Sequence, residues 1–313
     1  MTTFSEISRE FFGLYGKQSY ADALALVQAW LPAFPERRTE MITWEICMQS
    51  QLGRSADAIQ TLANAIQTST YWWSPDALHN DPDLAPLQGN PEYERLVSVC
   101  ENRWQTAMKK SRPERLVFAP KTGNTTKLPV LITFHGWGAN AEKEAPHWRG
   151  LADQGWLVAV TRSSQPRADG LYVWDDLGRS VREAKAHYRA LCRDYPVDTQ
   201  RLVLAGFSQG GGRALWLSLS RALPARGFIG VGPFLDEFDD LVPTLPPPRR
   251  SRLRVALVTG SEEQDEGMFA QIEELCKTRS IPFQQEVVPG IGHEYPPDFA
   301  PILSRAFAFI FEN

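Results

Sequence analysis

The chain divides into two parts by the spacing of its apolar residues. Up to about residue 110, apolar residues recur at the three- and four-residue spacing of amphipathic helices, with breaks at proline and glycine. From Leu116 onward, short β-rich runs alternate with amphipathic helical segments, which is typical of a mostly parallel sheet covered on both faces. We therefore predict an all-helical domain over residues 1–110 and an α/β domain over residues 111–313.

Seven segments of the second part have the length and composition of strands. Each is a short apolar or β-branched run followed by turn-forming residues. They are Leu116–Ala119, Val130–Phe134, Trp156–Val160, Arg201–Ala205, Phe228–Val231, Leu253–Val258 and Phe283–Val288. Open α/β sheets bind their ligands beyond the carboxyl ends of the strands, so we searched for chemistry in the residues that follow each strand.

The helical part contains an internal repeat. The sequence Ala21-Asp22-Ala23-Leu24 recurs as Ala56-Asp57-Ala58-Ile59, an offset of 35 residues, and a glycine followed by a basic residue lies upstream of each copy. This spacing resembles tetratricopeptide repeats, which pair two helices in about 34 residues. Two copies are too few for a free-standing array, so we expect them to dock on the second domain or to pair with another chain, as in a homodimer. The segment Glu101–Arg115 is interpreted as the linker between the domains.

Composition and charge point away from two classes of partner. Of the 313 residues, 43% are hydrophobic and 22% are charged, and the formal net charge of −4 gives no bias toward nucleic acid or anionic membrane. The first ten residues are polar, and no apolar run is long enough to span a membrane or to form the core of a signal peptide. We therefore predict a cytoplasmic protein that binds a small molecule.

Cysteine and histidine spacing gives no sign of a metal or redox centre. The four cysteines are far apart, without a Cys-x-x-Cys pair, and are interpreted as free buried thiols. They are Cys47, Cys100, Cys192 and Cys276. The histidines His79, His147 and His187 have no neighbouring ligands at the spacing of a zinc site. Neither a metal nor a cofactor is predicted.

The most informative segment is Gly206-Phe207-Ser208-Gln209-Gly210. It follows the strand-like run Arg201–Ala205 and precedes a helix-forming stretch, so a serine stands at the apex of a strand, a turn and a helix. Such a turn holds the hydroxyl clear of the sheet, where a base and a substrate carbonyl can reach it. The flanking glycines avoid collisions with the neighbouring strand and helix. We interpret Ser208 as a nucleophile.

Three other strand ends supply what a nucleophilic serine needs. The turn His135-Gly136-Trp137-Gly138 follows the second strand, and the backbone N–H groups of Trp137 and Gln209 could together bind an oxyanion. An acidic loop, Gly260–Asp265, follows the sixth strand, and Pro289–His293 follows the seventh. Serine, acid and histidine therefore occur in that order along the chain.

At this point a family resemblance can be stated. Residues 116–313 resemble serine esterases of the α/β-hydrolase superfamily, near the phospholipase/carboxylesterase and dienelactone-hydrolase-like enzymes. The resemblance rests on the segments Phe134–Gly138, Gly206–Gly211 and Gly290–Glu294. Dienelactone hydrolases carry cysteine at the nucleophile position, so Ser208 argues against that activity. The resemblance implies an α/β-hydrolase fold, preceded here by a small all-α helical-repeat domain, with His293 as the base.

The acid of the triad has three candidates. The family usually places an aspartate three residues after the glycine that ends the strand, and this chain has Glu263 there. Asp265 is the alternative if the loop is longer than usual, and Glu262 is the third candidate. In the resembling families the histidine at the position of His135 is structural, which again favours His293 as the base.

The segment before the long helix at about residue 177 has two interpretations. Trp174 could line the acyl or alcohol pocket, and the aspartates after it, Asp175 and Asp176, could cap the helix. For the whole chain we favour a carboxylesterase that acts on small to medium acyl esters or thioesters through an acyl-enzyme. The alternatives are a prolyl-oligopeptidase-like serine peptidase and a non-catalytic interaction protein that uses its helical repeats to bind a partner.

Overall fold

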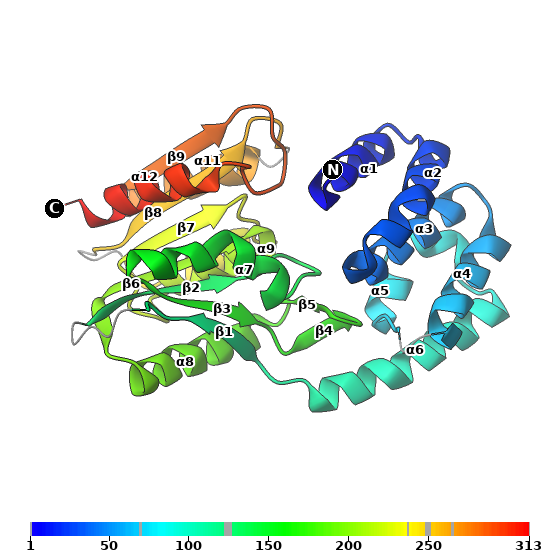
Figure 1. Cartoon of the computed structure of the whole chain (residues 1–313), viewed down its shortest axis with the longest axis horizontal. Helices are drawn as coiled ribbons and strands as arrows, with labels where there is room; N and C mark the ends of the chain where they lie inside the picture. The colour runs from blue at the N-terminus through cyan, green and yellow to red at the C-terminus, as the bar shows by residue number, and fades with distance from the viewer. Residues whose placement is uncertain are drawn as a thin grey trace. The chain divides into compact units, whose positions relative to one another are not determined.

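The chain divides into two compact units. Figure 1 colours the chain from blue at the N-terminus to red at the C-terminus. The computed structural model describes residues 2–68, 71–121, 127–236, 238–247, 252–263 and 266–312. Unit 1 consists of Met1–Ser111 and Gln165–Tyr172, and unit 2 consists of Arg112–Ser164 and Val173–Asn313. The chain therefore passes from one unit to the other three times, after residues 111, 164 and 172.

Unit 1 is built mainly from helices. They are α1 (Phe4–Gly16), α2 (Tyr20–Trp30), η1 (Leu31–Ala33), η2 (Pro35–Arg37), α3 (Arg38–Gln51), α4 (Ser55–Thr68), α5 (Pro75–His79), η3 (Pro82–Leu87) and α6 (Pro91–Lys110). Each of the first three α-helices packs on the next. Ala23 of α2 and Ala58 of α4, which are equivalent in the sequence repeat, are both fully buried. The two copies of the sequence repeat therefore lie on α2 and α4, and the tetratricopeptide-like pairing stays a prediction.

The aromatic residues before α5 belong to the core of unit 1. Trp72 and Trp73 are buried together with Tyr93 of α6. The indole N–H of Trp73 donates to Thr43 Oγ1 over 2.9 Å, and the Tyr93 hydroxyl donates to the carbonyl of Leu78 over 2.7 Å. These polar atoms are therefore paired inside the core, as buried polar groups need to be.

A short hairpin from the second half of the sequence completes unit 1. Its strands are β4 (Gln165–Ala168) and β5 (Leu171–Val173). Ala168 forms a β-bridge with Trp73, and the Trp104 indole N–H donates to the carbonyl of Pro166 over 2.9 Å. The sequence analysis placed no strand here, because strands of four and three residues around a proline lack a readable alternation.

In the described part of unit 2, seven strands form one sheet in the order β1-β3-β2-β6-β7-β8-β9. They are β1 (Glu114–Phe118), β2 (Leu128–Phe134), β3 (Leu157–Arg162), β6 (Val197–Phe207), β7 (Gly227–Val231), β8 (Arg254–Gly260) and β9 (Phe283–Val288). All neighbouring pairs are parallel except β1 and β3 at one edge. The seven predicted strands and the mostly parallel sheet are thereby confirmed.

Helices cover both faces of this sheet. They are α7 (Ala141–Trp148), η4 (Arg149–Gln154), α8 (Leu177–Asp194), α9 (Ser208–Leu219), α10 (Phe238–Leu241), η5 (Val242–Thr244), α11 (Glu266–Thr278) and α12 (Phe299–Phe311). Successive residues of β2 alternate between two cores: Ile132 packs with residues of α8, α9 and α11, and Leu131 packs with residues of α7 and α12. The strands are apolar on both sides because both faces are buried.

Two predictions about local structure are wrong. The helix α6 continues to Lys110 and β1 begins at Glu114, so most of the predicted linker Glu101–Arg115 is helical. Cys192 is exposed, whereas Cys47, Cys100 and Cys276 are buried thiols as predicted.

Within the described residues, no helix has both the length and the apolar character needed to cross a membrane.

Candidate active site

Ser208 stands at a sharp turn between β6 and α9. Its φ of +52° is in the left-handed region, which costs free energy for any residue with a side chain. The turn is tight against its neighbours: a Cβ on Gly206 would lie 2.6 Å from the Phe134 carbonyl oxygen, and one on Gly210 would lie 2.3 Å from the same oxygen. Only glycine fits at either position, as is typical of a strained strand-to-helix elbow that presents a serine hydroxyl.

Glu263 and His293 form a close pair at the ends of β8 and β9. Nδ1 of His293 and Oε1 of Glu263 are 2.5 Å apart, and the other carboxylate oxygen accepts the N–H of Gly260 over 3.1 Å. The carboxylate is enclosed, with 2% of its side chain exposed, while 39% of the His293 side chain is exposed. Nδ1 therefore carries the proton of this hydrogen bond, and Nε2 is left as the ring nitrogen that can accept one.

Of the predicted acids, Glu263 is the one that the structure brings against His293. The N–H of Glu262 donates to the carbonyl of Ile291 over 3.0 Å, so the backbone of the acidic loop is tied to the histidine loop. Glu262 itself is exposed. Asp265 lies outside the described residues.

The Glu263–His293 pair lies next to the nucleophile turn. The ring of Phe207, the residue before Ser208, is 4.7 Å from the His293 ring, and the carbonyl of Ser208 accepts the N–H of Phe234 over 3.0 Å. Gly232 follows β7 and lies against the Glu263–His293 pair. A Cβ there would lie 2.3 Å from Glu263 Oε1 and 2.9 Å from His293 Nδ1. Gly232 was not among the predicted site residues, because a single glycine after a strand is equally typical of an ordinary turn.

His135 is held in a way that excludes it as the base. The ring is fully buried, its Nδ1–H donates to the Gly136 carbonyl over 2.8 Å, and its Nε2 accepts the N–H of Ser163 over 3.3 Å. Burial lowers the pKa of His135 to about 4, so the ring is neutral near pH 7. Both nitrogens are occupied, which agrees with a structural role.

Trp174 connects the turn after β2 with the turn after β6. It is fully buried, its N–H donates to Oε1 of Gln209 over 2.9 Å, and its indole N–H donates to the carbonyl of His135 over 3.0 Å. The amide of Gln209 also donates to Asp175 over 2.7 Å. These contacts favour a positioning role for Trp174 over the predicted pocket-lining one. By contrast, Trp137 is 53% exposed. Its own backbone N–H is one of the two groups that were predicted to bind the oxyanion.

Comparisons with known proteins bear on the fold that carries these residues. A crystal structure of an uncharacterized protein from Bacillus cereus ATCC 10987 covers 99% of both chains with 25% identity and a TM-score of 0.56. Thermogutta terrifontis esterase 2, with propionate bound, matches 66% of this chain and 95% of its own with 15% identity and a TM-score of 0.50. Esterase PE8 matches 64% of this chain and 100% of its own, with 15% identity and a TM-score of 0.51.

Unit 2 has the α/β-hydrolase fold. Residues 3–108 match the model of a family described as "A/B hydrolase-like, N-terminal domain", so the helices of unit 1 are of a type that precedes such folds. Among curated proteins, the bifunctional acetylxylan esterase/xylanase XynS20E of Neocallimastix patriciarum is 30% identical over 99 residues. The match spans 30% of this chain and 14% of that relative.

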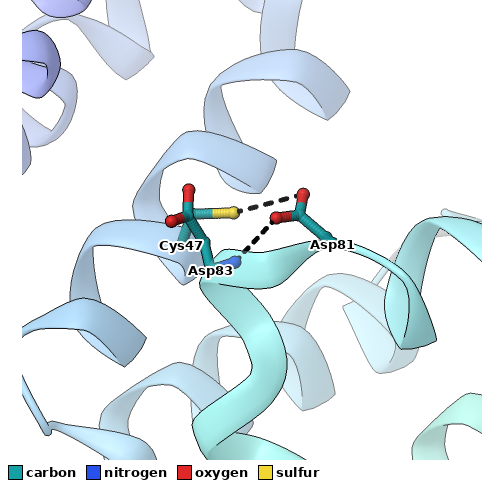
Figure 2. Close-up of side chains that lie close together, drawn as sticks. All are labelled: Cys47, Asp81 and Asp83. Carbon is teal, nitrogen blue, oxygen red and sulfur yellow. Dashed lines mark hydrogen bonds between the residues drawn. The ribbon is translucent and has the colours of Figure 1, made fainter.

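Among the described residues, unit 1 holds one cluster of potential metal ligands. Cys47 Sγ lies 3.9 Å from Asp81 Oδ2, and the N–H of Asp83 donates to Asp81 Oδ1 over 3.0 Å. Both contacts are drawn in Figure 2. Burial, together with the two aspartates, raises the pKa of the Cys47 thiol well above its usual range. Without a bound metal ion the sulfur therefore keeps its proton at neutral pH. Asp81 also acts as the cap of η3.

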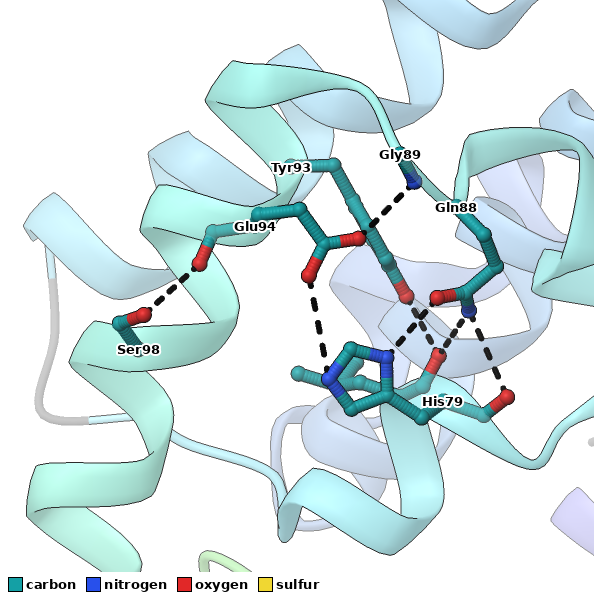
Figure 3. Close-up of polar contacts among 7 residues, drawn as sticks. His79, Gln88, Gly89, Tyr93, Glu94 and Ser98 are labelled. Atoms are coloured by element: carbon teal, nitrogen blue, oxygen red, sulfur yellow. Dashed lines mark hydrogen bonds and ion pairs between the residues drawn. The ribbon is translucent and has the colours of Figure 1, made fainter.

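A second polar group of unit 1 surrounds His79. Its Nδ1 is 2.8 Å from Gln88 Oε1, and its Nε2 is 3.9 Å from Glu94 Oε2 (Figure 3). The carboxylate of Glu94 also accepts the N–H of Gly89 over 3.0 Å, at the turn before α6. These contacts connect the end of α5 to the start of α6.

Proposed function

We propose that the chain is a serine hydrolase that cleaves carboxylic esters or thioesters of small to medium acyl groups. In this proposal Ser208 is the nucleophile, His293 is the base and Glu263 is the acid that orients it. The observation that carries the proposal is the enclosed Glu263 carboxylate bonded to the half-exposed His293, beside a serine whose φ is +52°. Ser208 directly follows β6, and Glu263 and His293 lie in the loops after β8 and β9 of the same sheet.

The proposed reaction has two halves. Nε2 of His293 takes the hydroxyl proton of Ser208 while Oγ attacks the ester carbonyl, and it then gives that proton to the departing alcohol or thiol. Water attacks the acyl-enzyme in the same way, with Nε2 again as the proton acceptor. Glu263 holds the Nδ1–H tautomer and stabilises the imidazolium, without taking the proton itself.

The negative charge that develops on the carbonyl oxygen needs hydrogen-bond donors. The backbone N–H groups of Trp137 and Gln209 are proposed for this role, and loss of one such donor elsewhere costs about 2.7–4 kcal/mol of transition-state stabilisation. The side chain of Gln209 is already engaged by Trp174 and Asp175. Its backbone is therefore well fixed, which favours preorganised donors over donors that must be ordered during the reaction.

Similarity to known proteins supports an ester as the substrate. The curated relative is described as an acetylxylan esterase joined to a xylanase. The structural neighbours that share the fold of unit 2 include two esterases. Acetyl is a small acyl group and is the one named for this relative, so acetate esters are the first substrates to test.

The experiment combines covalent labelling with turnover. The wild type and Ser208→Ala would be treated with a fluorophosphonate probe, which reacts with an activated serine by displacement of fluoride. The same samples would be assayed for hydrolysis of p-nitrophenyl acetate and p-nitrophenyl butyrate. We expect labelling and turnover of the wild type and neither in Ser208→Ala.

Other outcomes lead to other functions. Labelling with cleavage of peptides but poor ester turnover would favour a serine peptidase. A folded wild type that neither labels nor turns over any ester would contradict the proposal, and would leave a non-catalytic protein whose helical repeats bind a partner. Folding of each sample is checked by circular dichroism and thermal unfolding.

A further inference from the structure

Glu144 is an enclosed carboxylate that takes no part in the proposed reaction. It lies on α7 and is 3% exposed. Its Oε1 atom accepts hydrogen bonds from the Thr133 hydroxyl over 3.2 Å, the Trp148 indole N–H over 2.8 Å and the Tyr295 hydroxyl over 2.5 Å. The donors come from β2, from α7 itself and from the segment that follows His293. One carboxylate oxygen thus fastens three elements of unit 2 together.

Tyr295 is the donor that connects this carboxylate to the candidate active site. It is two residues after His293, and its ring stacks on His147 with 3.6 Å between centroids and 8° between planes. The Tyr295 ring also contacts Phe299, at 5.3 Å, and Phe207, at 5.1 Å. The Phe207 ring in turn lies 4.7 Å from the His293 ring. Tyr295 therefore contacts the residue that precedes the nucleophile and belongs to the loop that carries the base.

The charge state of the group is compatible with this arrangement. Burial raises the pKa of Glu144 to about 7, and burial together with the nearby Glu144 raises the pKa of the Tyr295 hydroxyl well above its usual range. The hydroxyl consequently stays protonated at neutral pH and can donate. A buried carboxyl contributes little to stability compared with an apolar side chain of similar size, so its value here lies in fixing the orientation of its partners.

We propose that Tyr295 is a positioning residue for His293, and that Glu144 is the carboxylate that holds the Tyr295 hydroxyl in place. The inference rests on the proposed function, since the position of His293 affects chemistry only if it serves Ser208 as base. Catalytic groups must be held close to their productive geometry, and a displacement of about 1 Å can cost about 10²-fold in rate. Loss of the Tyr295 hydroxyl frees the loop at a point two residues from the base.

Tyr295→Phe is the main test, because it keeps the ring that stacks on His147 and Phe207 and removes only the hydroxyl. Glu144→Gln is the second variant, since it keeps the shape of the side chain and removes the charge. The matched control is Tyr93→Phe in unit 1, where a buried tyrosine hydroxyl donates to the Leu78 carbonyl over 2.7 Å. Each variant is measured for its labelling rate with a fluorophosphonate probe, for kcat and KM on p-nitrophenyl acetate, and for thermal unfolding.

We expect Tyr295→Phe to lower both the labelling rate and kcat by about tenfold, with KM within about twofold, because the base is misplaced while the substrate site is kept. Glu144→Gln should show the same separation of kcat from KM at a smaller size. Tyr93→Phe loses a comparable buried hydrogen bond and should react at the wild-type rate. A loss of stability alone would therefore move all three unfolding temperatures without separating the rates.

Folded Tyr295→Phe and Glu144→Gln that label and turn over like the wild type would overturn the proposal. If Tyr295→Phe does not fold, Glu144→Gln decides alone, and unfolding of both would assign the cluster a purely structural role. Failure of the proposed function has a different signature, because the wild type itself would then remain unlabelled.

Discussion

The loop after β2 and the loop after β9 each carry a histidine, His135 and His293, and the fold gives them opposite environments. His135 is fully buried with both ring nitrogens bonded to backbone atoms, and burial lowers its pKa to about 4. His293 is 39% exposed and has a carboxylate on Nδ1. Two imidazoles at the same edge of one sheet therefore differ in whether a nitrogen is free to accept a proton.

The difference shows that residue type and position after a strand do not by themselves make a base. A ring that is enclosed and satisfied on both sides acts as a rigid part of the turn, whereas a ring paired on one side can exchange a proton on the other. Trp174 extends the contrast, because its indole N–H fixes the backbone of His135 while its own N–H fixes Gln209. The loop of His135 is held on both sides, and the loop of His293 is the one that we propose to react.

The largest expected effect comes from removing the imidazole ring of His293. His293→Ala should lower kcat/KM for p-nitrophenyl acetate by at least about 10³-fold, since the serine then lacks a base. Thermal unfolding should change little because the side chain is partly exposed. Turnover of the variant within tenfold of the wild type would break the comparison and require another base for Ser208.

The carboxylate partner of His293 gives the next effect. Glu263→Gln should lower kcat by about 10²- to 10⁴-fold, because an amide can hold the wrong tautomer and no longer stabilises the imidazolium. The control is Glu262→Gln, an exposed neighbour on the same loop. Equal losses in the two variants would contradict the assignment of the acid, and a loss in neither would point to the alternative, Asp265.

A backbone change can sharpen the comparison without touching either ring. Gly232→Ala would place a methyl group where Glu263 and His293 meet, so kcat should fall by about 10²-fold. Gly155→Ala is the matched control, because Gly155 also has a positive φ, +89°, but has nothing within 4 Å of its would-be Cβ. Both variants should lose about 1 kcal/mol or more of stability from backbone strain, and kinetics on the two samples separates strain from collision.

The smallest effect on activity is expected at His135. His135→Asn should keep kcat within about tenfold, yet lower the free energy of unfolding by about 1–3 kcal/mol, because it leaves the Ser163 N–H without its acceptor. Denaturant unfolding at pH 7 measures this cost. A loss of activity as large as that of His293→Ala would show that the two loops are not as different as their geometry indicates.

The same variant has a distinctive pH dependence. The pKa of His135 lies near 4 in the folded chain and near 6.5 when unfolded, so the unfolded chain binds more protons between these values. The wild type therefore loses about 3 kcal/mol of stability as the pH falls from about 6.5 to about 4. His187, whose pKa burial also lowers to about 4, acts equally in both proteins. The stability gap between wild type and His135→Asn should consequently shrink over this window.

The strands and the site order could be predicted because each depends on local sequence. Runs such as Val130–Phe134 are apolar at every position, which is the signature of a strand buried on both faces. Ser208 is marked by its glycines, since the close approach of the Phe134 carbonyl admits no side chain at Gly206 or Gly210. The resemblance to known esterases then indicated which of the histidines to follow.

Long-range contacts were beyond the reach of the sequence. Nothing in the residues around Glu144 indicates that Tyr295, 151 positions later, would donate to its carboxylate. Trp174 was predicted from its place in a loop, but its complete burial depends on the packing of segments that are 35 and 39 positions away. The hairpin of β4 and β5 was missed for the same reason, because its partners are residues of the first domain.

That hairpin has a consequence for the history of the chain. Ser74 donates to the Arg167 carbonyl over 2.6 Å, and Asp169 donates to the Trp72 carbonyl over 2.9 Å, so the helical unit includes backbone encoded within the other half of the gene. A fragment that ended at Ser111 would lack these partners of Trp72, Trp73 and Ser74. The two parts of the sequence are therefore not interchangeable modules, because each contributes backbone to unit 1.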